Sequence, residues 1–297
     1  MTTLLLLLPD LSLIVLGAVL YRALRWGDGF WAGLERLVYY VLFPALLFNS
    51  IARYRFDLGE AAPFAGAVLA IMALGITLGY VGGILLRPTP RRFASGVQCA
   101  FRFNSYVTLA LAQRLGGDAG VAWCAIAVAI AVPVGNIAAV YPLARHAGTG
   151  IWREMLRNPL ILATVSGLAA SLVGLQLPEP VSALLSRLGN AALALGLLTV
   201  GAGLRLTGVA GDRPFAIYAT SVKLVAMPLA ALAAGPLLGL PPLAWQILVL
   251  FASMPTASAS YILASRMGGD GPYVALLITV STLTSLAALP FWLSWVL

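Results

Sequence analysis

The chain has 297 residues, of which 61% are hydrophobic and only 9% are charged, and its formal net charge is +8. A soluble domain carries about 25% charged residues, so this composition excludes a soluble globular protein and indicates one that is integral to a lipid bilayer. The two cysteines lie in apolar runs and the single histidine, His146, lies in a charged segment, which excludes a disulfide framework and a zinc site of ordinary spacing.

Crossing the hydrocarbon core takes about 20 apolar residues, and the sequence contains ten such runs. The first run lacks the basic segment and the small-residue cleavage site of a secretory signal, so we expect a retained helix. The connections between runs are short and leave no room for a separate soluble domain. The sequence therefore predicts an all-α membrane protein with ten transmembrane helices at about 3–22, 30–51, 61–86, 93–113, 119–143, 158–175, 180–203, 214–237, 242–264 and 272–296.

Arginines are distributed unequally between the two sides of the predicted helices. Eleven lie in connections on one side, and three, Arg53, Arg55 and Arg114, lie on the other. By the positive-inside rule the first side is cytoplasmic, so we expect both termini on the outer side of the membrane. This distribution attributes the net positive charge to membrane topology, and it gives no support to a nucleic-acid partner.

The chain resembles itself weakly after a shift of about 150 residues. "LERL" (34–37) aligns with "LSRL" (185–188), "PFA" (63–65) with "PFA" (214–216), and "RLGGD" (114–118) with "RMGGD" (266–270). Each half holds five predicted spans, an odd number, so the second half enters the membrane upside down. The sequence thus predicts two inverted repeats, 1–146 and 147–297, which are typical of secondary transporters with a binding site near the membrane midplane.

The fourth span of each half has an unusually polar middle: "FRFNSYVTLALAQRLGGD" (101–118) and "MPTASASYILASRMGGD" (254–270). Pro255 removes a backbone donor and disfavours helical geometry before it, which predicts an interrupted helix in the second half. The first half has no proline there. Asn104 and Thr256 are equivalent in the two repeats; the alternative is that small residues merely permit close helix packing. The candidate substrate-binding residues are Arg102, Asn104, Ser105, Pro255, Thr256 and Ser258.

Two cations, Arg102 and Lys223, lie deep in predicted spans, where ionisable residues are functional candidates by default. Arg102 has two open roles, contact with substrate or capping of helix-end carbonyls. Lys223 is a candidate for proton coupling or charge compensation, unless it snorkels or becomes neutral. Candidates for lining the cavity are Tyr106, Asn136, Asn190 and Tyr261, each with interhelical hydrogen bonding or packing as its alternative.

All ten carboxylates lie at or near the ends of predicted spans, so we expect none near the midplane. Helix N-termini that face the site add partial positive charge. An anionic substrate suits such a site better than a bound sodium ion, although proton or sodium coupling stays open. The sequence has a single histidine, no HExxH motif and no paired aspartates near a predicted midplane. These absences disfavour an intramembrane enzyme, and we expect no cofactor.

Four stretches, "FPALLF" (43–48), "FRFNSYVTLALA" (101–112), "RNPLILATVSGL" (157–168) and "LGNAALALGLLTVGAGL" (188–204), resemble the auxin efflux carrier family in its short bacterial branch. The resemblance covers the whole chain. It implies an NhaA-like fold in which spans four and nine are crossed broken helices. The plant carriers have a proline at the first crossover, where this chain has Phe103.

The resemblance further implies an elevator-type carrier for small carboxylates such as malonate or malate, located in the bacterial cytoplasmic membrane. Spans 1, 2, 6 and 7 would form a scaffold and a homodimer surface, and spans 3–5 and 8–10 a moving transport unit. The alternative is a sodium-coupled organic-anion symporter of the bile-acid type, against which the missing midplane carboxylates count.

Overall fold

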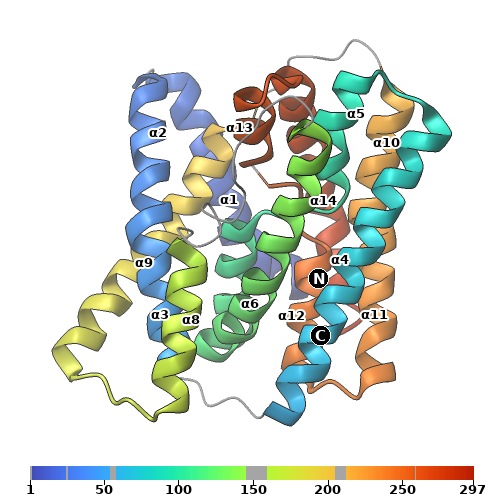
Figure 1. Cartoon of the computed structure of the whole chain (residues 1–297). Coiled ribbons are helices and arrows are strands. Elements are labelled where there is room, and N and C mark those ends of the chain that lie inside the picture. The colour runs from blue at the N-terminus through green and yellow to red at the C-terminus, as the bar shows by residue number, and fades with distance from the viewer. Residues whose placement is uncertain (1, 25, 54–57, 145–158, 205–211, 258) are drawn as a thin grey trace. The chain divides into compact units, whose positions relative to one another are not determined.

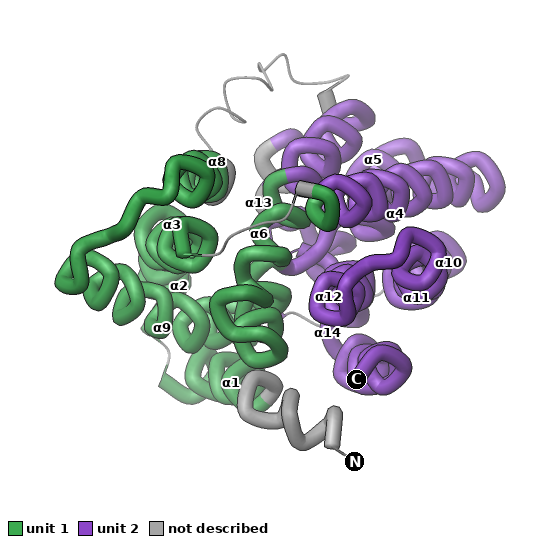
Figure 2. Tube along the Cα trace, turned by 90° about the horizontal axis from the view of Figure 1, so that it is seen from below, with its two compact units in different colours: residues 1–61, 105–129, 152–203 green, residues 62–104, 130–151, 204–297 purple. Residues whose placement is uncertain are grey.

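The structure is a computed structural model, and it describes residues 2–24, 26–53, 58–144, 159–204, 212–257 and 259–297. Within these ranges every regular element is a helix, which confirms the prediction of an all-α protein (Figure 1). By compactness the chain divides into two units, each of which draws segments from both halves of the sequence (Figure 2). The sequence repeats 1–146 and 147–297 stay a prediction.

Six helical runs in the described residues are long and apolar enough to cross a bilayer, and three shorter apolar helices accompany them. The run Pro90–Leu143 has 54 residues, enough for two passes at about 20 residues each. The coarse prediction of a multi-pass membrane protein is therefore confirmed, and the count of ten spans stays a prediction. The other long runs are Gly27–Arg53, Gly59–Leu86, Glu179–Ala202, Arg213–Leu238 and Gly271–Leu293.

Unit 1 comprises residues 1–61, 105–129 and 152–203. A side chain at Gly17 would collide with the backbone of Leu198, and one at Gly201 would collide with the backbone of Ile14. These glycines therefore permit the close approach of the first and last helices of the unit, as small residues do between membrane helices. The helices of unit 1 are α1 (Thr2–Leu24), α2 (Gly27–Leu37), the π-helical η1 (Val38–Leu42), α3 (Phe43–Arg53), the first part of α6 (Ser105–Ala144), α8 (Pro159–Leu172) and α9 (Glu179–Ala202).

Unit 2 comprises residues 62–104, 130–151 and 204–297. A π-helical turn of this unit, η3, contains Lys223, and such turns are frequent at functional sites. The helices of unit 2 are most of α4 (Leu58–Leu86), α5 (Pro90–Gly96), the 3₁₀ turn η2 (Val97–Ala100), the last part of α6, α10 (Arg213–Ser221), η3 (Val222–Ala226), α11 (Met227–Leu238), α12 (Pro242–Ala252), α13 (Ala259–Arg266) and α14 (Gly271–Leu293).

The two "GGD" sequences both form turns. Gly116 and Gly117 leave helical geometry inside α6, and Gly117 has a positive φ of 55°. Gly268, with φ of 73°, follows α13, and Asp270 then caps α14. A positive φ costs glycine little and other residues more, so the two glycine pairs place a sharp bend at the end of each polar span.

Candidate functional site

Unit 2 contains two non-helical segments, residues 101–104 and 253–257, each of which directly follows the end of a helix. Helix α5 and its 3₁₀ extension end at Ala100, and residues 101–104 are non-helical until α6 begins at Ser105. Helix α12 ends at Ala252, and residues 253–257 are non-helical before α13 begins at Ala259. The first interruption, residues 101–104, contains no proline.

Hydrogen bonds join the two interrupted segments directly. The backbone amide of Asn104 donates to the Pro255 carbonyl oxygen at 2.8 Å. The Thr256 hydroxyl donates to the Cys99 carbonyl oxygen at 3.0 Å, and the Gln98 side-chain amide donates to the Ser260 carbonyl oxygen at 3.3 Å. Backbone groups that an interrupted membrane helix leaves unpaired are thus satisfied by the other interruption.

The residues at the centre of this arrangement are almost inaccessible. Asn104 is 3% exposed and Thr256 is 1% exposed. A third helix supports them, because the Ser281 hydroxyl of α14 accepts a 3.1 Å hydrogen bond from the Thr256 amide. Phe103 packs edge-on against Phe251, with ring centroids 4.6 Å apart. The Phe103 ring therefore contacts the end of α12, the helix before the other interruption.

Arg102 lies beside these residues and donates to two side-chain amide oxygens. Its guanidinium donates to Gln98 Oε1 at 2.8 Å and to Asn136 Oδ1 at 3.1 Å. Gln98 was missed by sequence reasoning, although a glutamine within an apolar span was a usable signal. The structure thus brings Arg102 and the predicted Asn136 together and links both, through Gln98, to the second interruption.

Lys223 is fully buried and contacts the end of α12. Its ammonium donates to the Ala252 carbonyl oxygen at 2.9 Å, lies 3.7 Å from the Met227 sulfur and lies 5.8 Å from the centre of the Phe251 ring. Ala252 is the last residue of α12, and the final carbonyls of a helix lack helical partners and carry partial negative charge. Lys223 therefore caps a helix end, and with 0% exposure it does not reach water.

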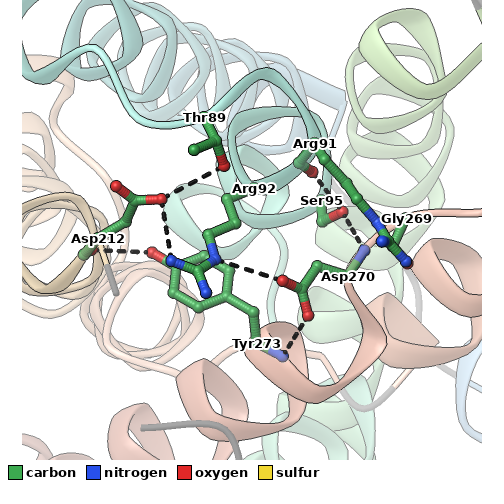
Figure 3. A network of polar contacts seen from close by, with 8 residues as sticks. All are labelled: Thr89, Arg91, Arg92, Ser95, Asp212, Gly269, Asp270 and Tyr273. Atoms are coloured by element: carbon green, nitrogen blue, oxygen red, sulfur yellow. Dashed lines mark hydrogen bonds and ion pairs between the residues drawn. The ribbon is translucent and has the colours of Figure 1, made fainter. Parts of the chain in front are cut away.

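A polar cluster in unit 2 engages both of that unit's acidic residues (Figure 3). Arg92 Nη1 lies 3.3 Å from Asp212, and its Nε lies 3.3 Å from Asp270. The guanidinium also lies 5.5 Å from the centre of the Tyr273 ring, whose hydroxyl donates to the Asp212 carbonyl. Asp212 and Asp270 are the only carboxylates in the sequence of unit 2, so none lies in either interrupted segment.

The remaining predicted residues do not all join this group. Ser105 and Tyr106 belong to unit 1, where the Tyr106 ring stacks on Phe43 with centroids 4.8 Å apart. Asn190 and Tyr261 are exposed, Tyr261 by 45%. Ser258 lies outside the described residues.

Glu35 departs from the expectation that carboxylates lie at span ends. The helical run begins at Gly27, which places Glu35 about 12 Å along a run that continues to Arg53. It lies on the same face as the buried Trp31 and Val38. The helix starts earlier than the hydropathy indicated, because Gly27 allows the chain to turn with a positive φ of 81°.

Comparison with known proteins places the chain among transporters. A family model described as "Membrane transport protein" matches residues 143–293, just over half of the chain. The chain is 27% identical to a Rhizobium meliloti protein named "Putative malonate transporter", over 95% of this chain and 92% of the relative. It is 25% identical to an "Uncharacterized transporter" of Methanothermobacter thermautotrophicus, over 96% of this chain and 95% of the relative. The chain therefore belongs to this family of membrane transport proteins, the auxin efflux carrier family that its sequence resembles.

Proposed function

We propose that the protein is a secondary carrier of small organic anions, with its binding site at the paired interruptions of unit 2. The observation that carries the proposal is the pair of bonds from the Asn104 amide to Pro255 and from the Thr256 hydroxyl to Cys99. These bonds hold two broken helices together at a buried point with polar groups from both. Asn104 and Thr256, at equivalent repeat positions, are the proposed ligands, with Ser105, Pro255 and Ser258 as neighbours in sequence.

The charges of unit 2 favour an anion. Its two carboxylates both pair with Arg92, and the two interrupted segments contain Arg102 but no carboxylate, with Lys223 bound to the end of α12. A cation inside a membrane protein costs at least about 2.5 kcal/mol on permissive scales, a cost that a bound anion offsets.

The helix ends at the interruptions add to this field. The C-terminal, partially negative ends are covered, since Thr256 donates to Cys99 near the end of η2 and Lys223 donates to Ala252 at the end of α12. The N-terminal end of α13 carries partial positive charge, which favours a carboxylate.

Malonate and other short dicarboxylates are the proposed substrate class. The name of the Rhizobium meliloti relative, which aligns along nearly the whole chain, supports this choice. In the proposed mechanism, an elevator-type displacement of spans 3–5 and 8–10 against a dimeric scaffold of spans 1, 2, 6 and 7 exposes the site alternately to each side. This implies ten spans in two inverted repeats, in the cytoplasmic membrane of a bacterium, with both termini outside.

A sodium-coupled symporter of the bile-acid type is the second candidate function. The observation in its favour is the set of neutral oxygen ligands near the interruptions, the side-chain oxygens of Asn104, Thr256 and Ser281. Without a carboxylate such ligands hold a sodium ion weakly, because hard cations prefer charged oxygens. We therefore rank it below the uncoupled or proton-coupled carrier.

The test is uptake into proteoliposomes that contain the purified full chain. Radiolabelled malonate, malate and indole-3-acetate are compared, each with and without a sodium gradient and a pH gradient. We expect saturable malonate uptake that excess unlabelled malonate inhibits. The proposal would be overturned if, under every gradient, none of the three acids entered the vesicles faster than it enters protein-free vesicles.

A further inference from the structure

A pocket lies within unit 2, at the ends of two candidate membrane spans. It has a volume of about 760 Å³ and is formed where the last turns of α4 and α6 meet the start of α5 and the turn after α13. Tyr80, Phe93 and Tyr141 supply aromatic walls and Met267 adds apolar surface. This volume falls in the range of sites for drug-sized ligands.

The aromatic wall is fixed by contacts with its surroundings. The Tyr80 hydroxyl donates to the Ala138 carbonyl oxygen at 2.8 Å, which joins α4 to α6. The Phe93 ring meets the Tyr80 ring edge-on, with centroids 5.7 Å apart. The pocket is therefore formed by a packed wall and is open on one side, where Tyr141 is 64% exposed.

One cation of this pocket has no carboxylate partner among the described residues. Arg91 lines the pocket and donates to the Gly269 carbonyl oxygen at 3.1 Å, as Figure 3 shows. Its neighbour Arg92 pairs with both Asp212 and Asp270, which leaves no other acid in unit 2 for Arg91. The bond to Gly269 fixes the guanidinium and leaves a full positive charge at the pocket.

The pocket lies at the ends of helices that are apolar enough to cross a membrane, which points to the membrane–water interface. Tyr80 is six residues before the end of α4, and Tyr141 is three residues before the end of α6. Tyrosines concentrate at this depth, and by the positive-inside rule the side that carries Arg87, Arg91 and Arg92 is cytoplasmic. Anionic lipids of that leaflet attract such basic groups.

We propose that this pocket binds an anionic phospholipid, with its phosphate on Arg91 and its glycerol and first acyl carbons against Tyr80, Phe93 and Tyr141. The lining decides between a lipid and a free anion, because a bare phosphate would use Arg91 and leave the aromatic and apolar surface unpaired. A phospholipid matches both parts, and it reaches the pocket along the bilayer. This proposal is independent of which substrate the protein carries.

The test is lipid binding to the purified full chain in detergent. Phosphatidylglycerol or phosphatidylcholine with the same acyl chains is titrated, and bound lipid is counted by native mass spectrometry. Inorganic phosphate and glycerol 3-phosphate serve as the free-anion arms. We expect phosphatidylglycerol to be retained and to raise the apparent melting temperature, with no comparable effect of the other three.

Matched variants locate the binding. Arg91→Gln removes the charge and is expected to weaken phosphatidylglycerol binding about fivefold. Arg213→Gln removes an exposed cation of the same unit that does not line the pocket, and it is expected to leave binding unchanged. Ala94→Phe fills the pocket and keeps every charge, so it is expected to abolish retention of the lipid even where Arg91→Gln proves unstable.

Three outcomes would overturn the proposal. Equal retention of both lipids would remove the selectivity for anions. Saturable binding of phosphate or glycerol 3-phosphate as tight as that of phosphatidylglycerol would make the site one for soluble anions. An equal loss in Arg213→Gln, or retained binding in Ala94→Phe, would place the lipid elsewhere on the surface.

Discussion

The backbone amide of Asn104 donates a 2.8 Å hydrogen bond to the carbonyl oxygen of Pro255. Two segments that are about 150 residues apart are thus joined through main-chain atoms at the point where both leave helical geometry. Because the bond uses no side-chain atom, the Asn104 side chain can be changed without breaking it. Variants of the Asn104 side chain therefore test its proposed role in substrate binding while the main-chain contact stays in place.

Asn104→Ala is expected to reduce carboxylate uptake in proteoliposomes by tenfold or more and to leave the apparent melting temperature close to that of the parent chain. A hydrogen bond to a charged group contributes about 1.5–3 kcal/mol, which corresponds to at least a tenfold loss of affinity. Gln176→Ala, at an exposed position outside the candidate residues, is the control and should transport normally. Full transport by Asn104→Ala would move the site elsewhere.

Thr256→Val is expected to destabilise the protein, because the Cys99 carbonyl then loses its 3.0 Å donor in a buried place. An unsatisfied buried group costs about 1–3 kcal/mol. Thr256→Ser keeps the hydroxyl and should melt near the parent temperature. The comparison is made by thermal unfolding in one detergent, and equal melting of the two variants would show that the hydroxyl bond does not support the interruption.

Sequence reasoning located both interruptions, but for different reasons. Pro255 is visible in the sequence, and it predicts a break because proline has no amide hydrogen to donate. The break at 101–104 has no such residue, and its geometry depends on bonds from Gln98 to Ser260 and from Thr256 to Cys99. Such long-range contacts cannot be read from local pattern, so only the polarity of "FRFNSY" pointed to the place.

The partners of the charged residues were beyond prediction for the same reason. Lys223 was identified as a buried cation, but its partner, the Ala252 carbonyl, depends on the register of a π-helical turn. Arg92 was counted only as a basic residue of a loop, whereas Asp212 and Asp270 reach it from two other turns. The hydropathy of a span shows where the membrane helix lies along the chain, but it does not determine which side chains contact one another.

Arg92→Gln is expected to lower the apparent melting temperature, since it leaves two carboxylates without their shared cation. The side chains are 26% and 22–23% exposed, so solvent screening keeps the effect below that of a buried pair. Thermal unfolding is measured at low salt and in 1 M salt, and the difference from the parent should shrink in high salt. Arg213→Gln, beside Asp212, is the control, and an equal effect of both variants would refute a specific role for Arg92.

Lys223→Met is expected to abolish anion transport while the protein still folds. Methionine has similar length and no charge, and replacing a buried charge by an apolar side chain is often neutral for stability. Lys223→Gln keeps a donor for the Ala252 carbonyl and should transport with an altered dependence on pH or voltage. Unchanged dependence in Lys223→Gln would exclude the lysine from coupling and charge compensation.

Uptake is expected to be independent of sodium. Charged oxygen ligands strengthen the binding of a hard cation such as sodium, and the two carboxylates of unit 2 both lie on Arg92. Initial malonate uptake into proteoliposomes is measured with external sodium replaced by choline at constant ionic strength, pH and membrane potential. Rates should agree within about twofold, a change in affinity of less than about 0.5 kcal/mol. Vesicles with Asn104→Ala give the background uptake to be subtracted. A saturable requirement for sodium would favour the symporter. The neutral oxygens of Asn104, Thr256 and Ser281 would then have to bind the ion without a carboxylate.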